Sequence, residues 1–207
     1  MKISYAITVC DEYVEIQRLV NFLLNHKRPH DEIVVLFDQT KGSEEISEWL
    51  VKKNKLPNFQ MWRGWFEGNF AEWKNKLSEY CSGDYIFQID ADEVPHINLI
   101  NNLPEILKYN PKNEVFLVPR VNTVEGITED HISQWKWKVN KKGWVNFPDL
   151  QTRIWKREGR IRWYGKVHER LVNFNTYTNL PEDEIFSLYH HKDISRQEKQ
   201  NNFYNNL

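Results

Sequence analysis

The stretch from residue 85 to residue 93 reads Tyr85-Ile86-Phe87-Gln88-Ile89-Asp90-Ala91-Asp92-Glu93. Its first five residues are largely apolar and predict a buried strand, which runs directly into acids. Residues i and i+2 of an extended segment point the same way, so Asp90 and Asp92 share one side. Two such carboxylates can hold a hard divalent cation such as Mg²⁺ or Mn²⁺. Acids are also common at loop starts for solubility alone, so the pair needs the context that follows.

Strand-like and helix-like segments alternate on the N-terminal side of this stretch. Apolar runs predict strands over residues 3–9, 32–37 and 59–62. Apolar spacing and capping residues predict helices over residues 13–26, 43–54 and 70–80. This alternation indicates an α/β fold with a mostly parallel sheet flanked by helices on both faces. Ligands of such sheets bind beyond the carboxyl ends of the strands, where Asp38, Asp90 and Asp92 are expected.

The chain after residue 95 has a less regular pattern. We expect a helix over 96–109 that Pro104 kinks or divides, and strands over 115–119 and 185–190. Short strand-like pieces rich in Trp fill residues 132–163, and Ser195 is expected to cap a final helix. The prediction is therefore one domain over residues 1–207. Its regular half, 1–95, binds the first substrate, and its irregular half, 96–207, completes the pocket.

Composition and charge narrow the class of protein. The 207 residues are 40% hydrophobic and 28% charged, which is ordinary for a globular domain. The net charge of -1 does not suit a nucleic-acid binder. However, residues 136–170 hold eleven basic and three acidic residues, which suits an anionic ligand bound between the two halves.

Cysteine count and hydropathy bear on the location of the protein. Cys10 and Cys81 are too few for a disulfide scaffold or a zinc cluster. The short apolar run at the N-terminus soon meets Asp11, which indicates a strand rather than a signal peptide. No stretch approaches the roughly 20 apolar residues of a membrane span. We therefore expect a cytoplasmic protein without a transmembrane segment.

Several segments together resemble one known family. Asn69-Phe70-Ala71-Glu72-Trp73-Lys74-Asn75 leads to Gly83-Asp84 and then to the acidic motif, and Gln151-Thr152-Arg153-Ile154-Trp155-Lys156 precedes Gly165-Lys166-Val167-His168-Glu169. Over residues 1–170 the chain resembles the family 2 glycosyltransferases, which have the GT-A fold. The last two segments are similar to a signature of the subset that acts on lipopolysaccharide core or polysaccharide.

The resemblance implies a metal-dependent, inverting hexosyltransferase. Such an enzyme moves a sugar from a nucleotide-diphosphate sugar to a glycan or to a lipid-linked saccharide. A lipid-linked acceptor would bring the chain near a membrane surface. It also implies roles for individual residues. The nucleotide sugar would be bound by Thr8, Cys10, Glu12, Asp38, Lys74, Asp90 and Arg153. Asp92, with Asp90 nearby, would hold Mn²⁺ or Mg²⁺, while Lys74 and Arg153 would add positive charge around the diphosphate.

An inverting transfer also needs a carboxylate that takes the proton of the acceptor hydroxyl. Glu169 is the first candidate for this general base and Asp149 the second. His168 has three interpretations: a structural histidine, a metal ligand or an acceptor contact. The pair His190-His191 is interpreted as structural, because neighbours on a strand point to opposite faces.

Aromatic residues make up 14% of the chain, and nine of them are Trp. Most are expected to fill the core. Trp135, Trp137 and Trp144 form either an acceptor platform or one face of a packed sheet.

Three other functions stay open. A nucleotidyltransferase would use the same acids, but such enzymes usually carry a Gly-rich loop after the first strand, and residues 8–12 contain no Gly. A catalytically inactive GT-A-like module that binds a sugar or nucleotide is the second. An RNA binder that uses residues 136–170 is the third, and it lacks the aromatic motif of an RNA-recognition sheet. We therefore expect no nucleic-acid partner.

Overall fold

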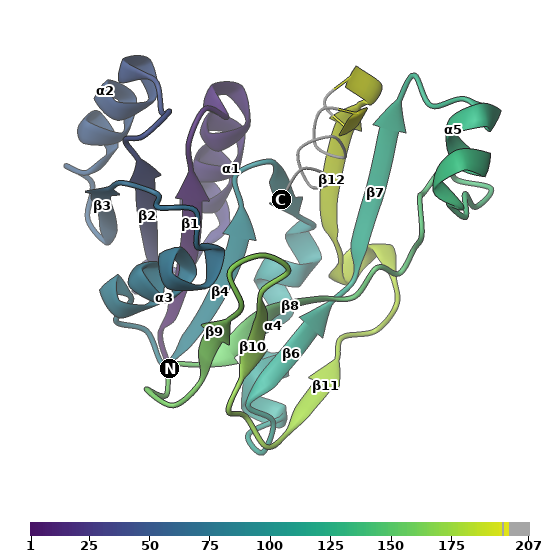
Figure 1. Ribbon diagram of the computed structural model, residues 1–207. Helices are drawn as coiled ribbons and strands as arrows, with labels where there is room; N and C mark the ends of the chain where they lie inside the picture. The colour runs from purple at the N-terminus through teal and green to yellow at the C-terminus, as the bar shows by residue number, and fades with distance from the viewer. Residues whose placement is uncertain (196, 199–207) are drawn as a thin grey trace.

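The computed structural model describes residues 1–195, 197 and 198, and its centre is a seven-stranded sheet in the order β11-β6-β8-β4-β1-β2-β3 (Figure 1). These strands are β1 (Ile3–Val9), β2 (Glu32–Asp38), β3 (Phe59–Gly64), β4 (Tyr85–Asp90), β6 (Val115–Val118), β8 (Gln151–Lys156) and β11 (Tyr177–Asn179). Only β8 among them is antiparallel to its neighbours, β4 and β6. The prediction of a mostly parallel sheet is confirmed.

Helices cover both faces of this sheet because the side chains of each buried strand alternate between the faces. Ile3, Tyr5 and Ile7 of β1 pack in one core cluster with the helices α1 (Tyr13–His26), α2 (Glu44–Lys53) and α4 (Ile97–Tyr109). Ala6 of the same strand packs in the other cluster with α3 (Phe70–Tyr80). Among the described helices, none has the length and apolar character that crossing a membrane requires.

Two small sheets extend the C-terminal half. The hairpin of β9 (Arg162–Tyr164) and β10 (Arg170–Val172) lies on the α3 side of the main sheet (Figure 1). The other sheet has the order β5-β12-β7 and consists of β5 (Glu93–Pro95), β12 (Leu188–Asp193) and β7 (Arg120–Glu125). The helix α5 (Glu129–Trp135) follows β7 and stands away from the main sheet, and a 3₁₀ turn (Glu184–Phe186) precedes β12.

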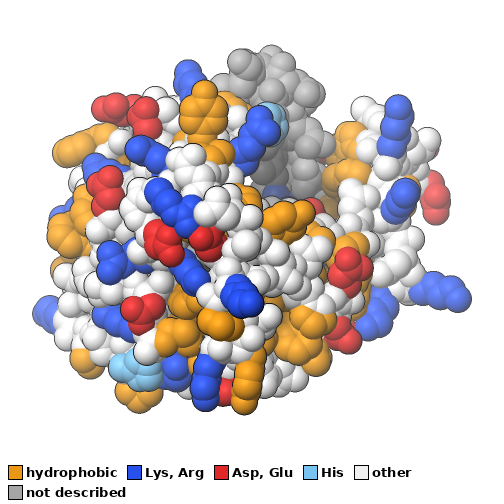
Figure 2. Space-filling view, turned by 90° about the horizontal axis from the view of Figure 1, so that it is seen from below, with side chains coloured by type: hydrophobic (Ala, Val, Ile, Leu, Met, Phe, Trp, Pro, Cys, Tyr) orange, Lys and Arg blue, Asp and Glu red, His pale blue; other side chains and the backbone are white. Residues whose placement is uncertain are grey.

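Surface charge is mixed on the face that Figure 2 shows from below. Lys and Arg side chains lie beside Asp and Glu side chains over most of this face. The near-zero net charge therefore reflects interspersed charges here rather than one basic and one acidic surface.

Element boundaries in the N-terminal half agree closely with the predictions: β1, α1 and α3 match them residue for residue. Ser43 and Asn69 cap α2 and α3 as expected, accepting hydrogen bonds from the backbone N–H groups of Ile46 and Glu72. Pro104 does not divide α4, which is one helix that His96 caps.

Three expectations for the C-terminal half were wrong or incomplete. Residues 132–135 are helical rather than strand-like, because Thr128 and His131 form a capping box that starts α5. This helix buries none of its side chains, so it shows no apolar period in the sequence. The late strand begins at Leu188. Ser195 lies inside a helical turn rather than before it, and most of the helix expected after it lies outside the described residues.

Candidate functional site

A cavity of about 790 Å³ lies at the carboxyl ends of β1 and β4. Because β8 is antiparallel, its first residues reach the same edge as the last residues of β4. The cavity therefore receives side chains from both halves of the chain. Most of the predicted site residues line it, namely Thr8, Glu12, Lys74, Asp90, Asp92, Asp149, Arg153, His168 and Glu169. Cys10 and Asp38 are outside this lining.

Asp90 is held by a buried arginine. Arg153, only 4% exposed, donates from Nη2 to Asp90 and, at 2.6 Å, to Oε1 of Glu93. The Asp90 backbone N–H donates to the other oxygen of Glu93 at 3.1 Å. Burial favours the protonated form of Asp90, but the charges of Arg153 and Lys74 outweigh it and hold its pKa well below the usual range. Asp90 is therefore an anion that already has one cationic partner.

Asp149 lies at the end of the same charge network, through Arg120. Arg120 donates to Glu93 Oε1 at 3.0 Å and to Asp149 Oδ2 at 2.8 Å. Asn122 Nδ2 and Gln151 Nε2 also donate to Asp149, at 2.6 and 2.8 Å. Burial raises the pKa of Asp149, but Arg120 and Asn122 lower it by more, so the group stays ionised at neutral pH.

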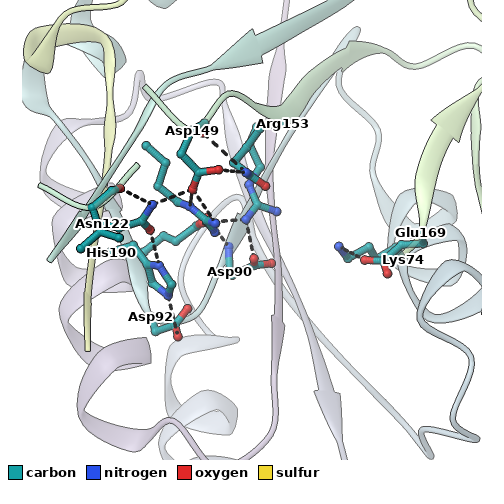
Figure 3. A network of polar contacts seen from close by, with 12 residues as sticks. Lys74, Asp90, Asp92, Asn122, Asp149, Arg153, Glu169 and His190 are labelled. Atoms are coloured by element: carbon teal, nitrogen blue, oxygen red, sulfur yellow. Dashed lines mark hydrogen bonds and ion pairs between the residues drawn. The ribbon is translucent and has the colours of Figure 1, made fainter. Parts of the chain in front are cut away.

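Asp92 faces a histidine from β12 (Figure 3). His190 Nε2 lies 3.3 Å from Asp92 Oδ2, and its Nδ1 lies 2.8 Å from Oδ1 of Asn122. Although burial favours the neutral acid, the contact with His190 lowers the pKa of Asp92. Asn122 therefore joins Asp92, through His190, to Asp149.

Lys74 and Glu169 form a second pair on another side of the cavity, apart from the cluster around Asp90 (Figure 3). Lys74 Nζ donates to Glu169 Oε1 at 2.5 Å and lies 4.5 Å from the centre of the Trp163 ring. His168 lies next to Glu169 in a turn, with a φ of 54°. The structure thus brings a cation and a carboxylate together opposite the strand-end acids.

The first turn after β1 holds Glu12 beside the cavity. Its Oε2 accepts the backbone N–H of Cys10 at 2.9 Å. Burial raises the pKa of Glu12, and the nearby Asp11 and Asp92 raise it further. Burial, together with Asp38, raises the pKa of Cys10 to about 12, so this thiol is not a nucleophile at neutral pH.

Among the described residues, Asp38 stabilises two loops through hydrogen bonds to their backbone. Its Oδ1 accepts the backbone N–H of Thr40 at 2.8 Å and that of Phe66 at 3.1 Å. Asp38 thereby ties together the loops that follow β2 and β3. Its predicted contact with the nucleotide sugar stays a prediction.

Sequence reasoning missed Arg120, Asn122 and His190 as cavity residues. His190 was interpreted as structural, and the structure places it in the cavity lining, in contact with Asp92. In the structure, Leu188, His190 and Lys192 of β12 are buried while His191 is exposed, as expected for side chains that alternate along a strand. The alternation already placed His190 and His191 on opposite faces, but nothing local showed which face meets Asp92.

Asp92 and His190 also fit one side of a divalent metal site. Among residues 1–195, 197 and 198, no three His, Cys, Asp or Glu side chains are grouped to hold a metal. Mg²⁺ keeps several waters and is usually bound by one or two carboxylates together with substrate phosphates. A carboxylate and an imidazole at 3.3 Å therefore suit an ion that takes its remaining ligands from a diphosphate and water.

Comparisons with known proteins identify the family and the fold of the chain. The family model described as Glycosyl transferase family 2 matches residues 4–180. The SPbeta prophage-derived glycosyltransferase SunS of Bacillus subtilis (strain 168) is 24% identical over 180 residues, which are 86% of this chain and 37% of SunS. The glycosyltransferase SunS of Bacillus phage SPbeta matches to the same extent.

Solved structures share the fold. The crystal structure of S. aureus TarS 1-349 in complex with UDP matches with a TM-score of 0.66 and 16% identity, over 92% of this chain and 60% of that one. The complex with UDP-GlcNAc matches with a TM-score of 0.63 and 15% identity, over 93% and 59%. The chain thus spans little more than a third of SunS and about three fifths of the TarS fragment. The predicted GT-A fold is confirmed, and this chain belongs to glycosyl transferase family 2.

Proposed function

We propose that the chain transfers a sugar from a nucleotide-diphosphate sugar to a saccharide acceptor, with inversion at the anomeric carbon. One observation carries the proposal: a single cavity joins Asp90 and Asp92 to cationic side chains from both halves of the chain. Transfer from a donor of this kind needs positive charge for the leaving diphosphate and a base for the hydroxyl of the acceptor. The solved TarS complexes contain UDP and UDP-GlcNAc, so uridine nucleotides are the first donors to test.

The metal ligands in this proposal are Asp92 and His190, with Mn²⁺ or Mg²⁺ as the ion. A bound divalent ion supplies Lewis-acid stabilisation of the charge that develops on the leaving diphosphate, worth several kcal/mol. Asp90 is engaged by Arg153 and is better placed to contact the ribose than to complete the metal site. His168, for which a metal ligand was one of three interpretations, lies beside Glu169 and is proposed as a donor or acceptor contact.

Lys74 is the proposed cation for the departing diphosphate. Its ammonium group is already inside the cavity, held by Glu169 at 2.5 Å. A preorganised cation costs little reorganisation when charge develops on the leaving group. Glu169 thereby positions Lys74, and this role takes it away from the role of base.

Asp149 is the proposed general base, ahead of Glu169. It is ionised at neutral pH, and three side chains fix its orientation. Oδ2 accepts from Arg120 and Asn122, whereas Oδ1 accepts only from Gln151 among the side-chain contacts described, which leaves a lone pair for an acceptor hydroxyl. A correctly placed base contributes about 10²–10⁴-fold to the rate.

The test is a thermal-shift screen of UDP, GDP and their sugar conjugates, with Mn²⁺, with Mg²⁺ and with EDTA. A nucleotide at 100 times its dissociation constant adds about 2.7 kcal/mol of stability, which is readily seen as a melting shift. We expect a shift that needs metal and is lost in Asp92→Ala and His190→Ala. The matched control is His191→Ala, the exposed neighbour of His190.

The screen also separates the proposal from its rivals. A metal-dependent shift with a nucleotide sugar, but no sugar release or transfer, would identify a binding module. The absence of any shift from folded protein would refute the donor site. The glycan or lipid-linked nature of the acceptor and the cytoplasmic location stay predictions.

A further inference from the structure

The strongest feature outside the donor machinery is an aromatic arm, which we define as residues 129–147. It consists of α5 and the loop that follows, and it stands away from the main sheet at the right of Figure 1. Lys136 ends α5 in the left-handed conformation, with a φ of 54°, and the backbone N–H of Trp137 returns to Ile132 O at 3.0 Å. This helix end fixes the direction of the chain at Trp137.

The rest of the arm is held to β7. The backbone N–H of Asn146 donates to Lys138 O at 2.7 Å, which closes the loop. The backbone N–H of Val145 donates to Asn122 O at 2.9 Å, which joins the loop to β7. The arm is therefore a hydrogen-bonded structure and not an unsupported loop.

Trp137 brings an indole ring into the cavity wall. The ring is partly exposed, lines the cavity, and packs on Trp135 with 4.7 Å between ring centres. Trp135 in turn stacks on His131 at 5.0 Å. The packing on Trp135 restricts the Trp137 ring at the point where it lines the cavity.

The cavity changes character from its donor side to the arm. Charged residues dominate the lining near the strand ends, including Glu12, Lys74 and Asp90. Among the lining residues from β7 and the arm, Arg120 is charged and is paired with Glu93 and Asp149. The other lining residues from these segments are uncharged, namely Asn122, Thr123, Val124, Trp137, Val145 and Asn146. The arm's lysines, such as Lys138 and Lys141, are exposed and outside this lining. This end of the cavity therefore offers an aromatic face and amide or hydroxyl groups, beside His190 and Lys192 of the paired strand β12.

The end of the cavity formed by β7 and the arm adjoins Asp149. The backbone N–H of Asp149 donates to Asn146 O at 3.1 Å, and the Asn122 side chain donates to Asp149 Oδ2 at 2.6 Å. A ligand on the arm would thus lie next to the carboxylate proposed as the base.

A neutral sugar ring matches this surface. It has an apolar C–H face that packs on an aromatic ring, and a rim of hydroxyls that pair with amide side chains. We infer that Trp137 forms an acceptor subsite that binds a neutral saccharide ring, stacked on the indole with its reactive hydroxyl toward Asp149. This inference rests on the proposed function and specifies the class of acceptor at the reacting position.

The experiment is saturation-transfer difference NMR with a mixture of cellobiose, lactose and maltose as probe, in the presence of UDP and Mn²⁺. We expect saturation transfer to the ring protons of at least one disaccharide with the wild type. The affinity should fall at least tenfold in Trp137→Ala and stay within about threefold in Trp137→Phe. Trp65→Ala is the matched control, because Trp65 is 68% exposed and lies outside the cavity lining.

A second measurement covers the case in which Trp137→Ala does not fold. The indole N–H resonance of Trp137, assigned by its loss in Trp137→Phe, should move when the disaccharides are added to the wild type. No saccharide contact in the wild type, an unmoved indole resonance, or equal binding by Trp137→Ala would each overturn the inference. A UDP-dependent melting shift in the same samples tells this failure apart from failure of the donor site, which would remove both proposals.

Discussion

Acidic side chains are paired with basic ones at both ends of the central sheet, but the two ends use these acids differently. At the amino end, Glu32 is 1% exposed and accepts hydrogen bonds from Lys2, Ser4 and Ser82. Asp31 beside it is equally buried and accepts from the Ile3 backbone and from Arg28. These groups knit strands and loops together, and neither Asp31 nor Glu32 lines the cavity.

At the carboxyl end, Asp90 and Asp92 are also paired, with Arg153 and His190, but they line a cavity of about 790 Å³. Burial and ion pairing of acids therefore do not by themselves mark a ligand site. What distinguishes the carboxyl end is that charged groups of both signs face open space, where a ligand can replace protein partners.

The largest difference between variants at the two ends of the sheet should be in the rate of turnover. Asp149→Asn keeps the size of the side chain but removes the proton acceptor, so we expect turnover with a saccharide acceptor to fall by about 10²–10⁴-fold. Glu32→Gln, the control at the amino end, should leave turnover per folded molecule unchanged. The measurement is the initial rate of nucleotide diphosphate release with donor and acceptor saturating. If Glu169→Gln shows the large loss and Asp149→Asn does not, the base is Glu169.

Stability should respond strongly at the buried end of the site network. Arg153→Met removes the cation that Asp90 and Glu93 share, so Asp90 loses this partner and the buried Glu93 keeps only its ion pair with Arg120. Breaking a buried ion pair in this way costs about 3–5 kcal/mol of unfolding free energy. Urea denaturation at pH 7 measures it, with Arg160→Met as the control, because Arg160 is exposed and should change stability little. Equal losses in the two variants would show that the network has no special energetic role.

At the amino end of the sheet, we expect an acidic residue to make the free energy of unfolding depend on pH in the acid range. Burial alone would raise the pKa of Glu32, but hydrogen bonds from Lys2, Ser4 and Ser82 lower it to about 2. An acid whose pKa is lower in the folded state stabilises above its unfolded pKa, near 4.5, and loses this contribution as pH falls toward 2. Glu32→Gln should therefore be less stable than the wild type by about 3 kcal/mol at pH 7.

The difference between Glu32→Gln and the wild type should then shrink between pH 4.5 and pH 2, which urea denaturation over this range measures. Glu105→Gln is the matched control, since Glu105 is an exposed acid on α4. A difference that stays constant with pH would show that Glu32 is not held in its ionised form by these partners.

The sequence predicted most of the sheet because local pattern determines it. An apolar run such as Ile3–Val9 or a capped amphipathic segment such as Phe70–Tyr80 carries its own period. The pairing of β8 between β4 and β6 is a long-range event with no local signal, so Arg153 could be assigned a diphosphate role from resemblance but not its place between Asp90 and Glu93.

The site was predicted on the same basis. Asp90 and Asp92 end a predicted strand, and their edge of the sheet follows from topology. His190 and Asn122 come from β12 and β7, whose mutual pairing places them in the cavity. The helix α5 escaped prediction because it buries no side chain and so has no apolar face to detect.

The smallest expected effect concerns Glu12. Its negative charge should lower the stability of the folded protein, whereas that of Glu32 should raise it. Burial and nearby acids raise the pKa of Glu12, so its ionised form is destabilised in the folded protein, unlike Glu32. An acid with a raised folded pKa lowers stability as pH rises through and above its unfolded pKa.

Glu12→Gln can keep the hydrogen bond from the Cys10 backbone while removing the charge. We expect a small rise in melting temperature at pH 7 that fades below pH 4, together with weaker binding of UDP in the thermal-shift assay. A fall in melting temperature at pH 7 would contradict the sign. A rise without any change in UDP binding would separate Glu12 from the donor site and leave its buried charge without a functional reason.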